Sequence, residues 1–214
     1  MEEHLVRCRL KPWSPHNFSY PLTPIHFHTI KADSVLGKHH LNRIMKEAKT
    51  VKSIVIYATK YGSTAEVAKR IKAELGGEAR LCNIMTDSVP PLDVYDTVIL
   101  GGSIYVGKVQ KKLTNYISRN LNSLLTKNVG LYLCAGETKE EGRLQFLQKA
   151  YPDTLYRHAA VKEVLGYAYA FDKMNFLERW IIKKIKGDNI STAEYDNDGI
   201  SQFAAVLNQK GSTP

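Results

Sequence analysis

The chain has 214 residues, a net charge of +9 and 43% hydrophobic residues, which suits one medium domain with a sizeable core, or one domain plus an extension. No apolar run approaches the roughly 20 residues of a transmembrane helix, and the N-terminus lacks the apolar core of a signal peptide. Three cysteines without close spacing argue against a disulfide framework. These features predict a cytoplasmic protein.

Residues 1–44 differ in composition from the rest of the chain. They hold six of the seven histidines, four of the eight prolines and a single glycine, and their apolar residues follow neither helical nor strand periodicity. A metal site is one interpretation of the histidines, but cysteines and carboxylates at ligand spacing are missing, which favours a flexible tail. We therefore expect residues 1–44 to be an irregular, dispensable extension, with Met45 as a candidate start, and residues 45–214 to form the folded domain.

Strands and helices alternate regularly from residue 53 onward. The predicted strands are 53–58, 78–84, 97–103, 129–135 and 161–170. The predicted helices are 63–75, 109–125, 139–151, 173–186 and 199–209. The first and third strands are continuous apolar runs, which is typical of strands buried on both faces. This alternation indicates an α/β fold in which helices cover both faces of a parallel sheet.

The loop after the first predicted strand is rich in hydroxyl groups. It runs from Thr59 to Thr64, and Gly62 allows the backbone to turn tightly there. Ligands of open parallel sheets bind at the carboxyl ends of strands, and hydroxyls with backbone N–H groups at a helix N-terminus bind anions. Neither a Walker A loop nor a dinucleotide fingerprint is present, so a single phosphate fits better than a pyrophosphate. The alternative is an ordinary helix start capped by Ser63.

Two further strand ends carry small residues. Three glycines bracket an Ile-Tyr pair in the segment Gly101–Gly107, which suits contact with a flat ligand or, alternatively, a glycine-rich connection with a surface tyrosine. The fourth strand ends in Cys134-Ala135-Gly136. Cys134 is interpreted as a small buried residue rather than a reactive thiol. Three such loops at three strand ends favour a shared ligand site.

Together these loops resemble those of the flavodoxin family. The stretch "YATKYGSTAEVA" is similar to the loop that binds the phosphate of flavin mononucleotide (FMN), with T-x-x-G-x-T at Thr59, Gly62 and Thr64. The stretch "ILGGSIYVGK" is similar to the loop along the isoalloxazine ring. The resemblance covers residues 53–209 and is greatest to the menaquinone-dependent protoporphyrinogen oxidase group. It implies a flavodoxin-like three-layer α/β sandwich, with five parallel strands in the order 2-1-3-4-5.

The resemblance also implies a set of FMN contacts. The phosphate would lie against Thr59, Lys60, Tyr61, Gly62, Ser63 and Thr64. The flavin would lie against Ser103, Ile104, Tyr105, Val106, Gly107, Cys134, Ala135 and Gly136. Because the flavin carries the redox chemistry, neither a catalytic triad nor a metal is expected.

For activity, the resemblance implies an FMN-dependent oxidoreductase of the quinone-linked protoporphyrinogen IX dehydrogenase type, in heme biosynthesis. The alternatives are an electron-transfer carrier without its own substrate and a domain that has lost the flavin. The chain departs from the group in a shorter segment after the fourth strand and in the tail "GDNISTAEYDNDG", which lacks a second glycine and a downstream tryptophan. These departures leave the substrate open.

The predicted helix Lys173–Lys186 is basic and amphipathic. Its expected apolar stripe consists of Met174, Leu177, Ile181 and Ile185. A helix docked on the sheet with a solvated basic face is the favoured interpretation. The alternatives are peripheral contact with anionic lipid on the inner face of the membrane and capture of an acidic substrate such as a porphyrin. The basic net charge favours an oxidoreductase that works with a quinone or another redox partner over a soluble electron shuttle. No motif supports nucleic acid binding.

Overall fold

The computed structural model describes residues 50–105, 107–188 and 190–211. The predicted extension over residues 1–44, with its histidines, lies outside the described residues, as does Val106. The boundary expected at residue 45 therefore stays a prediction.

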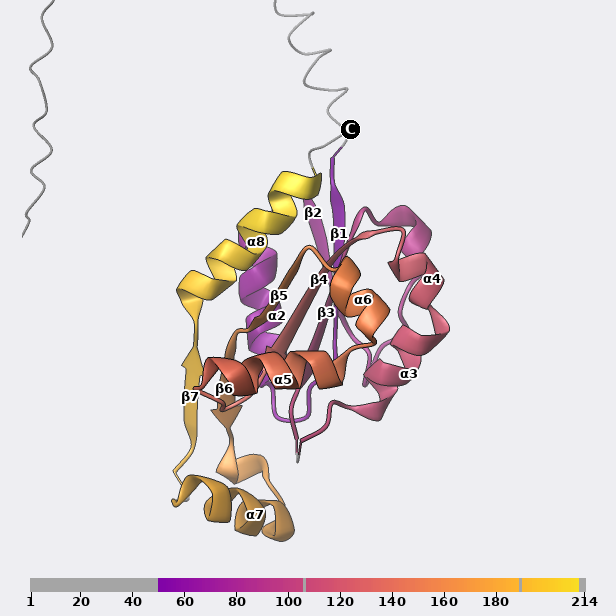
Figure 1. Cartoon of the computed structure of the whole chain (residues 1–214). Coiled ribbons are helices and arrows are strands. Elements are labelled where there is room, and N and C mark those ends of the chain that lie inside the picture. The colour runs from indigo at the N-terminus through magenta and orange to yellow at the C-terminus, as the bar shows by residue number, and fades with distance from the viewer. Residues whose placement is uncertain (1–49, 106, 189, 212–214) are drawn as a thin grey trace, which may run out of the picture. The chain divides into compact units, whose positions relative to one another are not determined.

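A five-stranded parallel sheet forms the centre of the domain (Figure 1). Its strands are β1 (Lys52–Tyr57), β2 (Glu78–Asn83), β3 (Thr97–Ser103), β4 (Asn128–Cys134) and β5 (Val161–Val164). The spatial order is β2-β1-β3-β4-β5, and Val55 of β1 pairs with Leu81 of β2 and Ile99 of β3. The predicted order 2-1-3-4-5 is confirmed.

Helices cover both faces of this sheet and make a three-layer sandwich. They are α2 (Ser63–Glu74), α3 (Lys111–Arg119), α4 (Leu121–Leu124), α5 (Glu140–Ala150), α6 (Asp153–His158) and α8 (Asn197–Gly211), with 3₁₀ turns at Leu92–Val94 and Phe171–Lys173. A further helix, α7 (Phe176–Lys186), lies beyond the end of the sheet (Figure 1). Ile54 and Ile56 pack in the core under α3–α6, whereas Val55 packs under α2 and α8, which lie side by side (Figure 1). Two apolar layers explain the uninterrupted apolar run in β1.

No helix in the described part of the chain is both long enough and apolar enough to cross a membrane.

The single strand predicted over 161–170 is wrong. β5 ends at Val164, and β6 (Gly166–Tyr169) leaves the parallel sheet to pair antiparallel with β7 (Thr192–Tyr195), a strand that the sequence pattern did not indicate. Gly166 has φ +125°, and a Cβ there would lie 2.3 Å from the carbonyl oxygen of Glu194. The chain changes direction where only glycine fits.

The helix predicted over 109–125 is interrupted at Asn120. Its side-chain amide donates to the carbonyl of Tyr116 at 2.9 Å, so the side chain competes with the helical hydrogen bonds and separates α3 from α4. The helix α6 was not predicted.

The basic helix begins at Phe176, not at residue 173. Asn175 caps it through a capping box, in which the Asn175 side chain accepts from the N–H of Glu178 and the Glu178 carboxylate accepts from the N–H of Asn175. The face of α7 that carries Glu178 and Ile182 is turned toward the domain, so part of the expected apolar stripe is wrong: Leu177 is exposed and Ile182 is buried.

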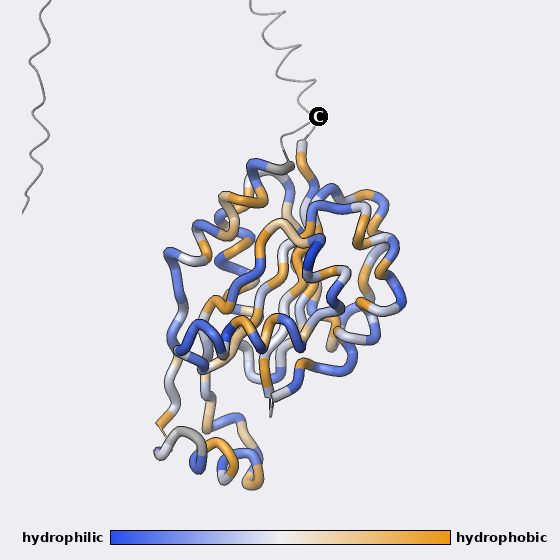
Figure 2. The backbone as a smooth tube through the Cα atoms, in the orientation of Figure 1, coloured by the Kyte–Doolittle hydropathy of each residue, from blue (hydrophilic) through white to orange (hydrophobic). Residues whose placement is uncertain are grey.

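β6, β7 and α7 together form an arm, residues 166–195, which extends beyond the carboxyl ends of the parallel strands (Figure 1). Figure 2 shows hydrophobic and hydrophilic residues alternating along α7. The arm therefore lies at the end of the sheet where ligands of this architecture bind.

Candidate functional site

The loop after β1 is closed by its own side chain. The N–H of Gly62 donates to the hydroxyl oxygen of Thr59 at 2.9 Å, and Gly62 has φ +103°, a conformation that side-chain-bearing residues rarely adopt. Gly62 is the N-cap of α2, and no side chain caps the helix. Capping by Ser63 is therefore wrong, because Ser63 is already the first helical residue.

The first turn of α2 fits an anionic group. The opening N–H groups of a helix have no helical acceptor, and this end of the helix dipole is positive. The hydroxyl oxygen of Thr64 is buried and has no hydrogen-bond partner among the described residues. The buried Tyr132 hydroxyl donates to the carbonyl of Thr64 at 3.0 Å and fixes the turn. With Ser63 beside the same turn, these residues fit a phosphate.

The loop after β3 is held by a glutamine. The side-chain amide of Gln110 donates to the hydroxyl of Ser103 at 2.7 Å, and the Ser103 N–H donates to Gln110 Oε1 at 3.3 Å. Tyr105 and Lys108 exchange backbone hydrogen bonds of 2.9 and 3.1 Å, and Gly107 between them has φ +74°. The loop is thus a tight, internally bonded turn that presents Tyr105.

The loop after β4 lies directly against the arm. The N–H of Ala135 donates to the carbonyl of Gly166 at 2.9 Å, and a Cβ on Gly136 would lie 2.1 Å from the Tyr169 hydroxyl. Burial raises the pKa of Cys134 to about 12, so the thiol stays protonated at neutral pH. Its environment favours the small buried residue over the reactive thiol.

These three loops and the arm enclose a cavity of about 260 Å³. The predicted residues that line it are Lys60, Tyr61, Ser63, Ser103, Ile104, Tyr105, Gly107, Cys134, Ala135 and Gly136. Thr59, Gly62 and Thr64 shape the loop after β1 without lining the cavity. The volume is close to the lower end of ligand pockets, roughly 300 Å³.

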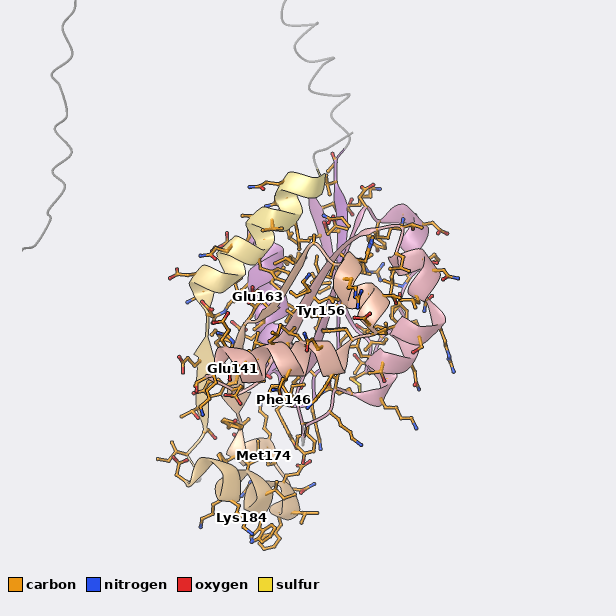
Figure 3. The ribbon with its side chains drawn as sticks, viewed as in Figure 1. Glu141, Phe146, Tyr156, Glu163, Met174 and Lys184 are labelled. Atoms are coloured by element: carbon orange, nitrogen blue, oxygen red, sulfur yellow. The ribbon has the colours of Figure 1, made fainter. Side chains whose placement is uncertain are left out.

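Sequence reasoning missed the remaining walls of the cavity. They include Gln110, Glu137, Phe146, Tyr167, Ala168, Tyr169, Met174 and Ile182. Five of these residues belong to the arm: three lie in the segment predicted as one long strand, and Met174 and Ile182 lie in the segment predicted as the basic helix. Figure 3 shows Phe146 on α5 at this end of the domain, and Met174 between α7 and the sandwich. The side chains of Tyr167 and Tyr169 lie together, with ring centroids 5.3 Å apart.

A buried carboxylate also joins the arm to the loop after β1. Glu178 is 6% exposed, and it accepts hydrogen bonds from the Lys60 ammonium, from the Tyr61 hydroxyl and, at 3.0 Å, from the N–H of Asn175. The bond from Lys60, followed by that from Tyr61, lowers the pKa of Glu178 to about 2. Burial, assisted by a hydrogen bond with Glu178, raises the pKa of Tyr105 to about 12. The N-x-x-E capping signal was visible in the sequence, but its contact with Lys60 was not.

The family follows from a direct comparison of the sequence. The profile of the family described as "Flavodoxin domain" matches residues 54–196, more than half of the chain. The chain belongs to the flavodoxin domain family. The predicted resemblance is confirmed, and the matched segment of this flavodoxin domain contains the three loops and the whole arm.

Individual relatives are distant. Protoporphyrinogen IX dehydrogenase [quinone] of Escherichia coli K12 is 23% identical over 143 residues, which cover 63% of this chain and 78% of the relative. A flavodoxin from the domain Archaea is 12% identical, with a TM-score of 0.46 over 76% of this chain and 100% of the other. A variant flavodoxin of Fusobacterium nucleatum bound to flavin mononucleotide is 18% identical, with a TM-score of 0.42; the match covers 75% of this chain and 97% of the other.

Proposed function

We propose that the protein is an FMN-dependent oxidoreductase that binds its flavin non-covalently between the three loops and the arm. One observation carries this proposal: ten of the residues expected to contact FMN, taken from three separate segments of the sequence, line a single cavity. Membership of the flavodoxin domain family supports the same cofactor. When bound, FMN would supply the redox chemistry, and the protein would orient and shield it.

The residues divide into two groups by what they would bind. The phosphate would lie at the N-terminus of α2, against the backbone N–H groups and the hydroxyls of Ser63 and Thr64. Lys60 is already paired with Glu178, so we expect its role to be placement of the loop more than neutralisation of the phosphate. The ring would lie along the turn that presents Tyr105, with the arm residue Tyr169 excluding water from the other side.

For the substrate, we propose quinone-linked oxidation of protoporphyrinogen IX, in heme biosynthesis. The support is the similarity to the Escherichia coli dehydrogenase of that name, together with the basic charge of +9, which suits an acidic substrate. An electron carrier without its own substrate is the alternative. The arm favours the enzyme, because Met174 and Ile182 form a wall of the cavity and restrict access to it.

The site is tested by titrating FMN with the purified protein and measuring the quenching of flavin fluorescence, which gives the affinity. Gly62→Val should weaken binding at least tenfold, because a β-branched residue at φ +103° costs about 1–3 kcal/mol. Thr59→Ala should weaken it several-fold by releasing the Gly62 N–H. Gly76→Ala, where a Cβ meets nothing closer than 3.6 Å, is the control and should bind normally. If all three variants bound FMN with equal affinity, the assignment of the loop after β1 to the FMN phosphate would be wrong.

Turnover then separates the candidate functions. Flavin-loaded protein is mixed anaerobically with protoporphyrinogen IX and a quinone, and porphyrin fluorescence is followed. Product formation that depends on both FMN and quinone supports the dehydrogenase. Flavin binding and electron exchange with a reductase, without porphyrin formation, would show a carrier instead. Failure to bind FMN would contradict both and leave a domain that has lost its flavin.

A further inference from the structure

The outward face of α7 concentrates exposed apolar side chains. Phe176 is 87% exposed, Leu177 64% and Trp180 56%, all on one helix of 11 residues. Residues four apart lie on the same side of a helix, so Phe176 and Trp180 stand one above the other, with Leu177 beside them. Large apolar side chains grouped in this way on a surface mark a contact with something outside the domain.

The exposed charged residues of α7 on this face are all cations. Arg179, Lys183 and Lys184 are exposed, and the Lys184 ammonium lies 5.2 Å from the centroid of the Trp180 ring. Figure 3 shows Lys184 on the side of α7 away from the sandwich. Glu178 is the single acidic residue in the sequence of α7, and it is buried against Lys60 and Tyr61. The outward face is therefore both apolar and cationic.

A groove of about 560 Å³ runs along this face. The rings of Phe176 and Trp180 line it together with the cations Arg179 and Lys183. The groove also contains the acidic residue Asp172, whose carboxylate accepts from the Ser191 hydroxyl at 3.4 Å. Rings beside two cations suit an amphiphile that has an anionic head.

We propose that this face of α7 docks on an anionic phospholipid surface, with the helix axis parallel to the membrane plane. Aromatic rings favour the boundary between headgroups and acyl chains, and long cationic side chains reach the phosphates while their stems stay apolar. The outward side chains of α7 combine two aromatic rings and a leucine with neighbouring cations, which is the composition of helices that lie in the headgroup region of a membrane.

Docking in this way would place the cavity close to the lipid. Ile182 lines the cavity from the opposite side of α7, so the two surfaces are separated by about one helix diameter, roughly 10 Å. The lipid contact does not depend on the flavin, and vesicle binding can therefore be measured with or without FMN. Failure of the proposed function would leave the lipid result unchanged.

The test uses the full chain with Trp13→Phe, which leaves Trp180 as the single tryptophan. Vesicles contain either phosphatidylcholine alone or 30% phosphatidylglycerol. Binding should be at least tenfold tighter to the anionic vesicles and should weaken with salt. Trp180 emission should shift to the blue and be quenched by lipids with brominated chains. Lys183→Gln and Lys184→Gln should each weaken binding about fivefold.

Two further variants complete the test. Phe176→Ser should weaken vesicle binding at least tenfold, whereas Val94→Ser, at another exposed apolar residue, should have no effect. The thermal unfolding midpoints of both should match the parent, because both side chains are exposed. Absence of binding to anionic vesicles, or binding that the α7 variants do not change, would overturn the proposal. A blue shift that follows protein concentration without lipid would instead indicate a second copy of the chain on this face and would also overturn it.

Discussion

Glu178→Gln is the sharpest test of how the arm is held on the domain. The substitution keeps the shape of the side chain and removes the charge that accepts from Lys60, Tyr61 and Asn175. A hydrogen bond to a buried charged group contributes about 1.5–3 kcal/mol. The ion pair contributes less, about 0.2–1 kcal/mol, because Lys60 is 51% exposed. We expect α7 to lose about 2 kcal/mol of docking free energy, roughly a thirtyfold increase in local opening.

Hydrogen exchange of the α7 amides measures this opening directly. The pH dependence identifies its cause. The pKa of Glu178 falls from 4.5 to about 2 on folding, so the charge stabilises the docked arm fully above pH 4.5 and progressively less as the pH falls toward 2. The difference in opening free energy between wild type and Glu178→Gln should therefore be constant near neutral pH and shrink below pH 4.5.

The control for this experiment is Glu66→Gln. Glu66 forms a half-buried i,i+4 pair with Arg70 at 3.0 Å, and its loss should cost about 0.5 kcal/mol. Equal exchange of α7 in wild type and Glu178→Gln at pH 7 would refute the role of the carboxylate in docking. A difference that stayed the same down to pH 3 would refute the charge as its source.

Two more outcomes follow from the packing of the site. Gly101→Ala should lower the free energy of unfolding by about 3 kcal/mol, because the new Cβ would lie 2.0 Å from the Tyr132 ring. Urea denaturation measures this loss, and a urea midpoint equal to that of Gly76→Ala would contradict the packing. Burial raises the pKa of Cys134 to about 12, so iodoacetamide should leave this thiol unmodified in the folded protein at pH 8. Rapid labelling of Cys134, detected by peptide mass spectrometry, would contradict this and show that the thiol is accessible and ionised.

The parts of the fold that the sequence predicted are those governed by local pattern. Ile54 to Ile56 is apolar without interruption because neighbouring side chains enter two different cores, and that pattern survives in the sequence alone. The three loops were predictable for a related reason. Parallel strands end at the same edge of the sheet, so loops far apart in the chain had to meet there.

The arm escaped prediction because its determinants are long-range. The β-branched and aromatic residues of 161–170 suit one continuous strand, whereas the turn at Gly166 depends on its close approach to the carbonyl of Glu194, far along the chain. Lys60 and Glu178 are 118 residues apart in sequence, and no periodicity connects them. The apolar stripe expected on the basic helix was partly wrong for the same reason, since the contacts of Glu178 with Lys60 and Tyr61 decide which face of α7 is turned inward.

The two ends of the arm meet at its base. Gly166 pairs with Tyr195, and the N–H of Asp196 donates to the carbonyl of Leu165 at 3.3 Å. The chain thus leaves and re-enters the sandwich at adjacent points, and the arm behaves topologically as an insertion between β5 and α8. Evolution can lengthen, shorten or exchange such an insertion without rethreading the sheet. The outward face of α7 is thus independent of the strand order, while Glu178 on its inward face ties the arm to Lys60 and Tyr61 in the loop before α2.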